Sequence, residues 1–102
     1  MNEEYVNLEL INNKTDQRFE MNVNGNKAII EYQRYPDKIA LLHTEVQPQL
    51  EGKRAATAII EKALAYLEKN NLKLIPLCPL VVVYLKRHPE WKRLVDEELT
   101  NT

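Results

Sequence analysis

Residues 43–65, HTEVQPQLEGKRAATAIIEKALA, join an extended segment to an amphipathic helix through a short polar connection. The first N–H groups of a helix have no partner within the helix and carry partial positive charge. Because the connection contains Gly52 and leads into a helix start, it is a possible anion site. The same residues could also serve only as a turn between strand and helix.

The length and composition are those of an ordinary globular domain. The chain has 102 residues, of which 44% are hydrophobic and 28% charged, and this predicts a single domain over residues 1–102. A formal net charge of -1 gives no sign of bulk binding to nucleic acid or anionic lipid. The acidic start MNEEYVNLELINN is unlike a signal peptide, and no apolar run approaches the roughly 18 residues of a membrane span. The single cysteine, Cys78, excludes an internal disulfide and a Cys-rich zinc site. We therefore expect a cytoplasmic protein that contacts neither nucleic acid nor a membrane.

Alternation of apolar and polar residues predicts the strands of the first half. Residues 6–10 alternate over a short stretch, which predicts a strand, and the polar residues 12–16 predict a loop. Residues 19–23 and 28–32 alternate on either side of Asn24-Gly25, a strong hairpin signal. Residues 39–46 begin with four apolar residues, which predicts a strand in the centre of the sheet.

The second half predicts a helix, a strand and two further helices. Apolar residues between positions 56 and 67 recur at spacings of three and four, and Asn70-Asn71 ends this helix. Residues 72–76 predict a strand parallel to residues 39–46, because the helix crosses over between them. Pro79 favours a second helix, although the three valines that follow have strand propensity, and Pro89 favours a third. The expected fold class is α+β with a mostly antiparallel sheet.

These segments together resemble the GNAT acyltransferase superfamily, and more closely its short single-domain GNAT-like members. The resemblance rests on HTEV at residues 43–46, EGKRAA at 51–56, and CPL at 78–80 followed by Tyr84 and HPEW at 88–91. RFE at residues 18–20 and the hairpin also fit, so the resemblance covers residues 6–96. It implies a minimal GNAT-like fold, in which a crossover helix and C-terminal helices accompany a twisted, mostly antiparallel sheet.

The resemblance implies an N-acetyltransferase that moves an acetyl group from acetyl-CoA to an unidentified amine. The pantetheine arm would enter between the third and fourth strands of the main set and pair with the backbone of Glu45 and Val46. The pyrophosphate would lie on the amides from Gly52 to Ala56. The cofactor-binding residues implied in this way are Val46, Glu51, Gly52, Lys53, Arg54, Ala55 and Ala56.

The turn before the helix departs from the superfamily pattern, Gln/Arg-x-x-Gly-x-Gly/Ala. In one register the three defined positions fall on Glu51, Arg54 and Ala56, of which only Ala56 fits. A second register begins at Gln49 and places Gly52 on the first glycine. Arg54 either obstructs the close approach of phosphate that glycine permits or offers the phosphate a guanidinium group.

Four residues are candidates for the chemistry: Cys78, Tyr84, His43 and Glu45. Cys78, between a strand end and a helix start, is either an acyl acceptor or a small buried hydrophobe. Tyr84 matches the tyrosine that protonates the departing CoA thiolate in many GNAT enzymes, or it packs in the core. His43 and Glu45 share one face of a strand and could deprotonate an amine jointly, although such a histidine can also be structural. His88 is interpreted as a cap, and the two histidines have no metal-ligand spacing.

Two other classes of function compete with the enzyme. The main rival is a non-catalytic acyl-CoA-binding or regulatory module with the same fold, and the third is a protein-interaction domain that uses Trp91. The acceptor stays open among a protein lysine, an N-terminus, a polyamine and a small metabolite. We expect a monomer or a weak homodimer, because an exposed sheet edge could pair with a second copy.

Overall fold

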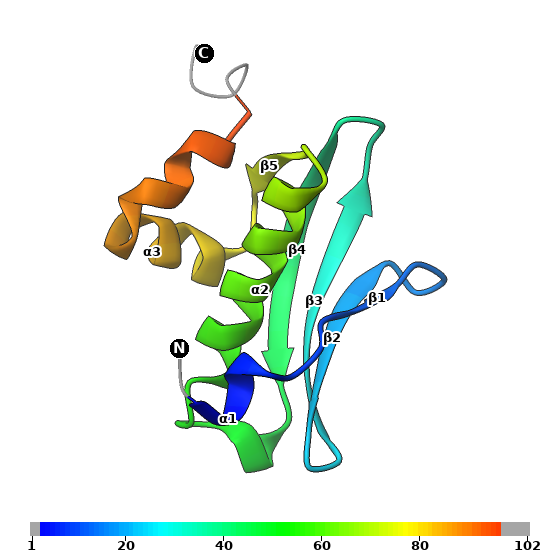
Figure 1. Ribbon diagram of the computed structural model, residues 1–102, viewed down its shortest axis with the longest axis vertical. Coiled ribbons are helices and arrows are strands. Elements are labelled where there is room, and N and C mark those ends of the chain that lie inside the picture. Colours follow the sequence, from blue (N-terminus) through cyan, green and yellow to red (C-terminus); the bar gives the residue numbers. More distant parts are fainter. Residues whose placement is uncertain (1–2, 97–102) are drawn as a thin grey trace.

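The structure, a computed structural model, describes residues 3–96 and is built on one five-stranded sheet (Figure 1). The strands lie in the order β1-β2-β3-β4-β5, with antiparallel pairing throughout except between β4 and β5, which are parallel. Their bounds are β1 Ile11–Asn13, β2 Arg18–Val23, β3 Asn26–Arg34, β4 Lys38–Val46 and β5 Lys73–Pro76. The helices are α1 Glu3–Val6, α2 Ala55–Lys69 and α3 Pro79–Arg87, with 3-10 segments η1 Pro48–Leu50 and η2 Pro89–Leu94. The expected α+β class with a mostly antiparallel sheet and a crossover helix is confirmed.

The hairpin of β2 and β3 forms where the sequence predicts it. Asn24 and Gly25 have φ angles of 52° and 84°, the positive values that a two-residue type I′ turn requires. The side chain of Asn22 accepts a hydrogen bond of 3.0 Å from the Gly25 N–H group and supports the turn. The register pairs Phe19 with Ile30, and both side chains are fully buried. The buried apolar residues of the hairpin therefore lie on one face of the sheet.

Helix α2 covers that apolar face, which we call the core face; the opposite one is the outer face (Figure 1). Ile59, Leu64 and Leu67 of α2 are fully buried, and each contributes about 1.5–3 kcal/mol relative to an exposed side chain. Asn71, with a φ of 55°, follows the helix end as predicted. Because α2 crosses over the sheet, β5 runs parallel to β4, which confirms the predicted crossover.

The strand predicted for residues 6–10 is wrong. The described part of the chain begins instead with α1, in which Tyr5 is fully buried and its hydroxyl donates a 2.7 Å hydrogen bond to the carbonyl of Lys53. The carbonyl of Leu8 accepts a 2.7 Å hydrogen bond from the Lys62 ammonium. Both contacts join residues far apart in the sequence, so local alternation gives no sign of them.

The first strand, β1, lies in the stretch that was predicted to be a loop. The side chain of Asn12 accepts a hydrogen bond of 2.6 Å from the hydroxyl of Tyr32 and donates one of 3.1 Å to the hydroxyl of Tyr66. These bonds hold a polar strand in place, and polarity alone is therefore a poor guide to a loop at this position.

The C-terminal part confirms the helical interpretation of residues 79–87. Pro79 occupies the first turn of α3, and Pro89 that of the 3-10 segment η2. After η2, Val95 forms a parallel bridge with Leu74, and the N–H group of Asp96 donates a 3.0 Å hydrogen bond to the carbonyl of Leu74. The described chain thus ends beside β5. None of the described helices has the length and apolarity to cross a bilayer.

Candidate active site

Strands β4 and β5 separate halfway along β4. Their pairing runs only from Lys38 opposite Lys73 to Leu41 opposite Pro76. The carbonyl of Leu41 then accepts hydrogen bonds from the N–H groups of Leu77 and Cys78, at 3.1 and 2.8 Å, and α3 begins. Proline at position 76 has no N–H group with which to continue the ladder. Among residues 3–96, residues 42–46 of β4 consequently have no strand partner on this side, and we call their backbone the open edge of β4.

A bulge lies at the same position. The register with β3 pairs Glu31 with His43 and Tyr32 with Leu41, so Leu42 is an extra residue in β4. A bulge bends its strand and increases the local twist. The bulge and the end of β5 therefore coincide, and together they turn the second half of β4 away from β5.

The register also determines which backbone groups face the gap between β4 and β5. The N–H group of Gln47 donates a 3.0 Å hydrogen bond to the carbonyl of Lys27 in β3. Because hydrogen-bonded and non-bonded pairs alternate in an antiparallel ladder, Glu45 also bonds toward β3. The N–H and C=O groups of Thr44 and Val46 point the other way, toward the gap. Of the two residues expected to offer their backbone, Val46 faces the gap and Glu45 does not.

The candidate catalytic side chains divide between the two faces of β4. On the core face, Cys78 is 1% exposed, and its Sγ lies 3.3 Å from Oγ1 of Thr44. On the outer face, Nε2 of His43 lies 3.3 Å from Oε1 of Glu45, and both side chains are exposed. The predicted pairing of His43 with Glu45 on one face is thus present. Both pairs flank the open edge of β4.

Tyr84 is held at the junction of α2, α3 and η2. Burial raises the pKa of its hydroxyl, the nearby Glu61 carboxylate of α2 raises the pKa further, and a hydrogen bond from Trp91 lowers it. The ring stacks on His88 with 4.3 Å between ring centroids. The hydroxyl therefore faces Glu61 and Trp91. His88, predicted to be a cap, does follow the end of α3 and also provides this stacking contact.

The connection from β4 to α2 leads into the helix start at which the anion site is expected. Gly52 and Arg54 have φ angles of 75° and 62°, and α2 begins at Ala55. Glu51 and Lys53 use their N–H groups within the connection, donating to the carbonyls of Pro48 and Leu50. The N–H groups of the first turn of α2, from Ala55 onward, have no acceptor within the helix. The side chains of the connection, residues 51–54, are exposed.

Arg54 occupies a left-handed conformation that glycine adopts without strain. For a residue with a Cβ this conformation costs roughly 1–2 kcal/mol. The backbone geometry of a glycine is thus retained at this position although the side chain is arginine. Arg54 has no side-chain capping bond to α2, and its side chain is exposed beside the helix start.

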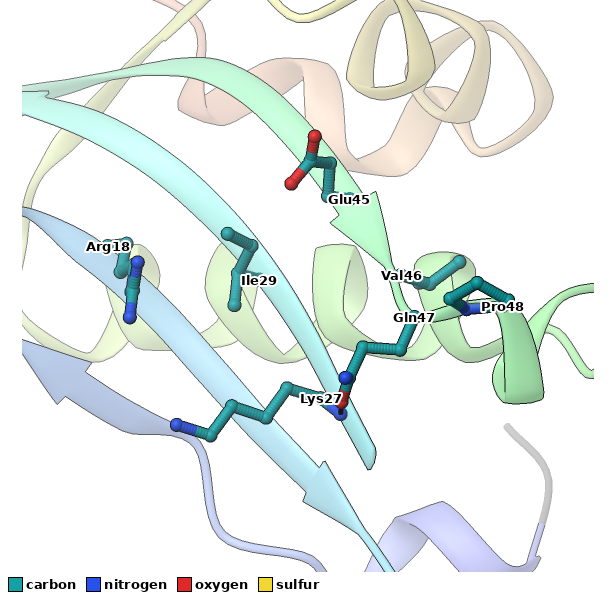
Figure 2. A pocket seen from close by; sticks show the side chains of 7 residues that line it. All are labelled: Arg18, Lys27, Ile29, Glu45, Val46, Gln47 and Pro48. Carbon is teal, nitrogen blue, oxygen red and sulfur yellow. Dashed lines mark hydrogen bonds between the residues drawn. The ribbon is translucent and has the colours of Figure 1, made fainter. Parts of the chain in front are cut away.

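The outer face carries a pocket that sequence reasoning missed (Figure 2). It has a volume of about 430 Å³ and is lined by Arg18, Lys27, Ile29, Glu45, Val46, Gln47 and Pro48. Beside it, the nearly buried carboxylate of Glu20 lies 2.7 Å from Nε of Arg18 and 3.4 Å from Nζ of Lys27. Strand alternation alone puts Arg18, Glu20, Lys27 and Ile29 on one face of the sheet. It does not predict that these residues lie close to Glu45.

Hydrogen bonds from Asn13 and Arg18 lower the pKa of Glu20 to about 2. The charged form of this carboxylate is therefore strongly favoured in the folded protein. Among the described residues, no three His, Cys, Asp or Glu side chains gather in a way that could hold a metal ion. The charges on the outer face pair with one another instead.

The lowered pKa of Glu20 predicts a pH-dependent stability. A carboxyl group with a pKa depressed in the folded state stabilises the fold above its unfolded pKa of about 4.5, and this contribution is lost as the pH falls toward about 2. The difference in unfolding free energy between the native protein and Glu20→Gln should be at most about 3 kcal/mol at neutral pH and should shrink with acidification. Urea denaturation across this pH range measures it. Glu31→Gln, an exposed carboxylate on the same face, is the matched control, and a difference for Glu20→Gln that is constant with pH would contradict the assignment.

Comparison with known proteins gives a match to one family, over a range that includes the open edge of β4. No curated protein matches the chain. The family model described as GCN5-related N-acetyl-transferase matches residues 18–94, which include the hairpin, the open edge, the helix start and Cys78. The chain therefore belongs to the GCN5-related N-acetyltransferase family.

Proposed function

We propose that this protein binds acetyl-CoA along the open edge of β4 and transfers the acetyl group to an amine. The open edge itself is the observation that supports the proposal most directly. Within the described part of the chain it offers unpaired N–H and C=O groups of Thr44 and Val46, and α2 begins nine residues after Val46. Membership of an acetyltransferase family agrees with such a reaction.

The residues beside the open edge suit the two chemically different parts of acetyl-CoA. The amide groups of pantetheine can pair with the backbone of Thr44 and Val46 as a neighbouring strand would. The pyrophosphate can accept hydrogen bonds from the N–H groups of Ala55 and Ala56, where the helix dipole favours an anion. Lys53 and Arg54 place exposed cationic side chains at the same position. The carboxylate of Glu51, which is exposed, can turn toward water.

The acceptor would react from the outer face, because His43 and Glu45 lie there. In the proposed reaction, the amine nitrogen bonds to the thioester carbonyl carbon, and the amine proton passes to His43. The carbon–sulfur bond then breaks, and the CoA thiolate takes a proton from the thiol of Cys78 on the core face. A thiol can donate a proton to another thiolate as a general acid when the two sulfur atoms lie close together. The base, His43, and the acid, Cys78, thus lie on opposite faces of β4 at its open edge.

Cys78 also permits a covalent route. Its thiolate would attack the thioester, form an acetyl-cysteine and release CoA, and the amine would then take the acetyl group from Cys78. Both routes use Cys78, whereas Tyr84 directs its hydroxyl to Glu61 and Trp91. We therefore propose a structural role for Tyr84 at the junction of α2, α3 and η2.

Substitution of Arg54 tests the role of the helix start. Arg54→Gly should change acetyl-CoA affinity by less than tenfold, equivalent to about 1.4 kcal/mol, because the backbone already has the glycine conformation. Isothermal titration calorimetry on the parent and the variant measures this difference. Lys14→Gln, a change in the loop between β1 and β2, is the control. A gain of more than tenfold would show that the arginine side chain obstructs the site, and absence of binding by the parent would refute the proposal.

Two substitutions distinguish the role of Cys78 from that of Tyr84. Cys78→Ala should lower kcat at least tenfold with acetyl-CoA affinity retained, while Tyr84→Phe should keep kcat within threefold of the parent. Release of CoA from acetyl-CoA in the presence of an amine measures the rate. If Tyr84→Phe lowers kcat more than Cys78→Ala does, Tyr84 and not Cys78 is the proton donor. Acetyl-CoA binding without turnover for any amine would instead indicate the non-catalytic module.

The two routes through Cys78 differ in one observable. Rapid quenching after mixing with acetyl-CoA, followed by intact-mass measurement, detects an acetyl group on the protein only for the covalent route. Cys78→Ser keeps the size of the side chain and controls for acetylation elsewhere. Because the buried thiol lies beside Thr44 on the side away from His43, we expect direct transfer and no acetyl-protein. An acetyl group that appears and decays at the turnover rate would establish the covalent route.

A further inference from the structure

The N-terminal helix α1 lies against the connection that leads into α2 (Figure 1). The side chain of Tyr5 is fully buried, and its hydroxyl donates a 2.7 Å hydrogen bond to the carbonyl of Lys53. The Lys62 ammonium of α2 anchors the same segment a second time, because it donates a 2.7 Å hydrogen bond to the carbonyl of Leu8. This segment lies outside residues 18–94, the range that matches the family. The family match therefore assigns no role to Tyr5.

We propose that Tyr5 is a positioning residue for acetyl-CoA. Its hydroxyl orients the peptide group between Lys53 and Arg54, so that the N–H group of Arg54 joins those of the first turn of α2 in binding the pyrophosphate. The inference rests on the proposed function, because that proposal lays the pyrophosphate at the start of α2. It adds a residue from a distant segment of the chain to the site.

The hydrogen bond of Tyr5 determines the direction of the next N–H group. No peptide bond among the described residues is cis, and in a planar trans peptide the C=O and N–H groups point in opposite directions. The carbonyl of Lys53 points to the buried hydroxyl, so the N–H group of Arg54 points away from it. No backbone carbonyl among residues 3–96 accepts a hydrogen bond from this N–H group. Successive N–H groups beside a left-handed residue form a concave site for an anion.

The other contacts of the helix start leave this peptide group free to rotate. Helix α2 does not use the carbonyl of Lys53, because the N–H group of Ala58 donates to the carbonyl of Arg54, at 3.1 Å. Arg54 has no side-chain capping bond, and its φ of 62° is unfavourable for a residue with a Cβ. Rotation of the peptide group to a negative φ would relieve this strain and turn the N–H group of Arg54 inward. The hydroxyl of Tyr5 opposes the rotation, because the carbonyl of Lys53 would lose its partner.

The ring and the hydroxyl of Tyr5 can be tested separately. The ring belongs to the hydrophobic core, and Tyr5→Phe retains it while removing the hydroxyl. Tyr32→Phe is the matched control, since Tyr32 is also nearly buried and its hydroxyl donates a 2.6 Å hydrogen bond to Asn12, away from the connection. Each variant loses one hydrogen bond of a buried tyrosine. The two variants should therefore lose similar stability, and only Tyr5→Phe should alter the helix start.

Calorimetric titration with two ligands separates positioning from a general loss of stability. Tyr5→Phe should raise the Kd for acetyl-CoA about three- to tenfold, which corresponds to the net effect of one hydrogen bond. The Kd for acetyl-pantetheine, which lacks the pyrophosphate, should not change, and Tyr32→Phe should leave both Kd values unchanged. An equal loss of affinity for both ligands, or no loss for acetyl-CoA, would overturn the proposal.

A double substitution tests the orientation of the peptide group itself. Glycine adopts a positive φ without strain, so in the Arg54→Gly background the peptide group depends less on the hydroxyl of Tyr5. Adding Tyr5→Phe to Arg54→Gly should then change the Kd for acetyl-CoA by less than about twofold, which is a non-additive result. A purely structural role of Tyr5 would give the same change in both backgrounds, and that outcome would contradict the proposal.

Titration with ADP, followed by NMR, distinguishes this inference from acetyl transfer. ADP carries the pyrophosphate without the thioester, and it should shift the backbone amide resonances of Arg54 and Ala55, with a smaller shift of Arg54 in Tyr5→Phe. If this is observed but no amine is acetylated, the role of Tyr5 stands and acetyl transfer fails. If the parent and Tyr5→Phe acetylate an amine with equal kcat and KM for acetyl-CoA, acetyl transfer stands and the inference fails. Absence of any shift of Arg54 in the parent would also overturn the inference.

Discussion

The separation of β4 from β5 is the constraint on which the rest of the site depends. Parallel strands ordinarily pair along their shared length, and here the pairing ends after Leu41. Three local features produce this end: the extra residue Leu42 in β4, the missing N–H group of Pro76, and the start of α3 at Pro79. If β5 continued beside β4, the backbone N–H and C=O groups of Thr44 and Val46 would form hydrogen bonds with β5. No ligand could then pair with them.

The alternation of side chains along β4 also separates the proposed base, on the outer face, from the buried thiol, on the core face. Successive side chains of a strand point to opposite faces, so His43 and Glu45 face outward while Thr44 faces the core and Cys78. An acceptor on the outer face is thereby kept apart from the buried thiol. The acetyl group would lie between them, at the level of the strand. This arrangement requires no large active-site cavity, which suits a protein with a short chain.

Much of the fold could be predicted because its signals are local. Asn24-Gly25 determines the hairpin, the apolar stripe of α2 determines the crossover, and Pro79 determines the start of α3. The N-terminal segment could not be predicted, because Tyr5 and Asn12 are held by partners about 50 residues away in the sequence, Lys53 and Tyr66. Those contacts override the alternation of residues 6–10.

The candidate site was predictable only in part, for a related reason. Short motifs singled out the helix start and Cys78 as candidates, and strand alternation predicted that His43 and Glu45 share one face, as the structure shows. The direction of a side chain depends on its neighbours in space, and Tyr84 turns to Glu61 and Trp91 for that reason. The pocket on the outer face joins β2, β3 and β4, and only the register brings Arg18 and Glu45 to its two sides.

Hydrogen–deuterium exchange, followed residue by residue by NMR, tests the central claim most directly. The amides of Thr44 and Val46 face the gap, whereas those of His43 and Glu45 already bond to β3. Addition of acetyl-CoA should therefore slow exchange at Thr44, Val46, Ala55 and Ala56 and leave His43 and Glu45 almost unchanged. Binding of acetyl-CoA with no change at Thr44 and Val46 would contradict the claim that the open edge of β4 holds the ligand.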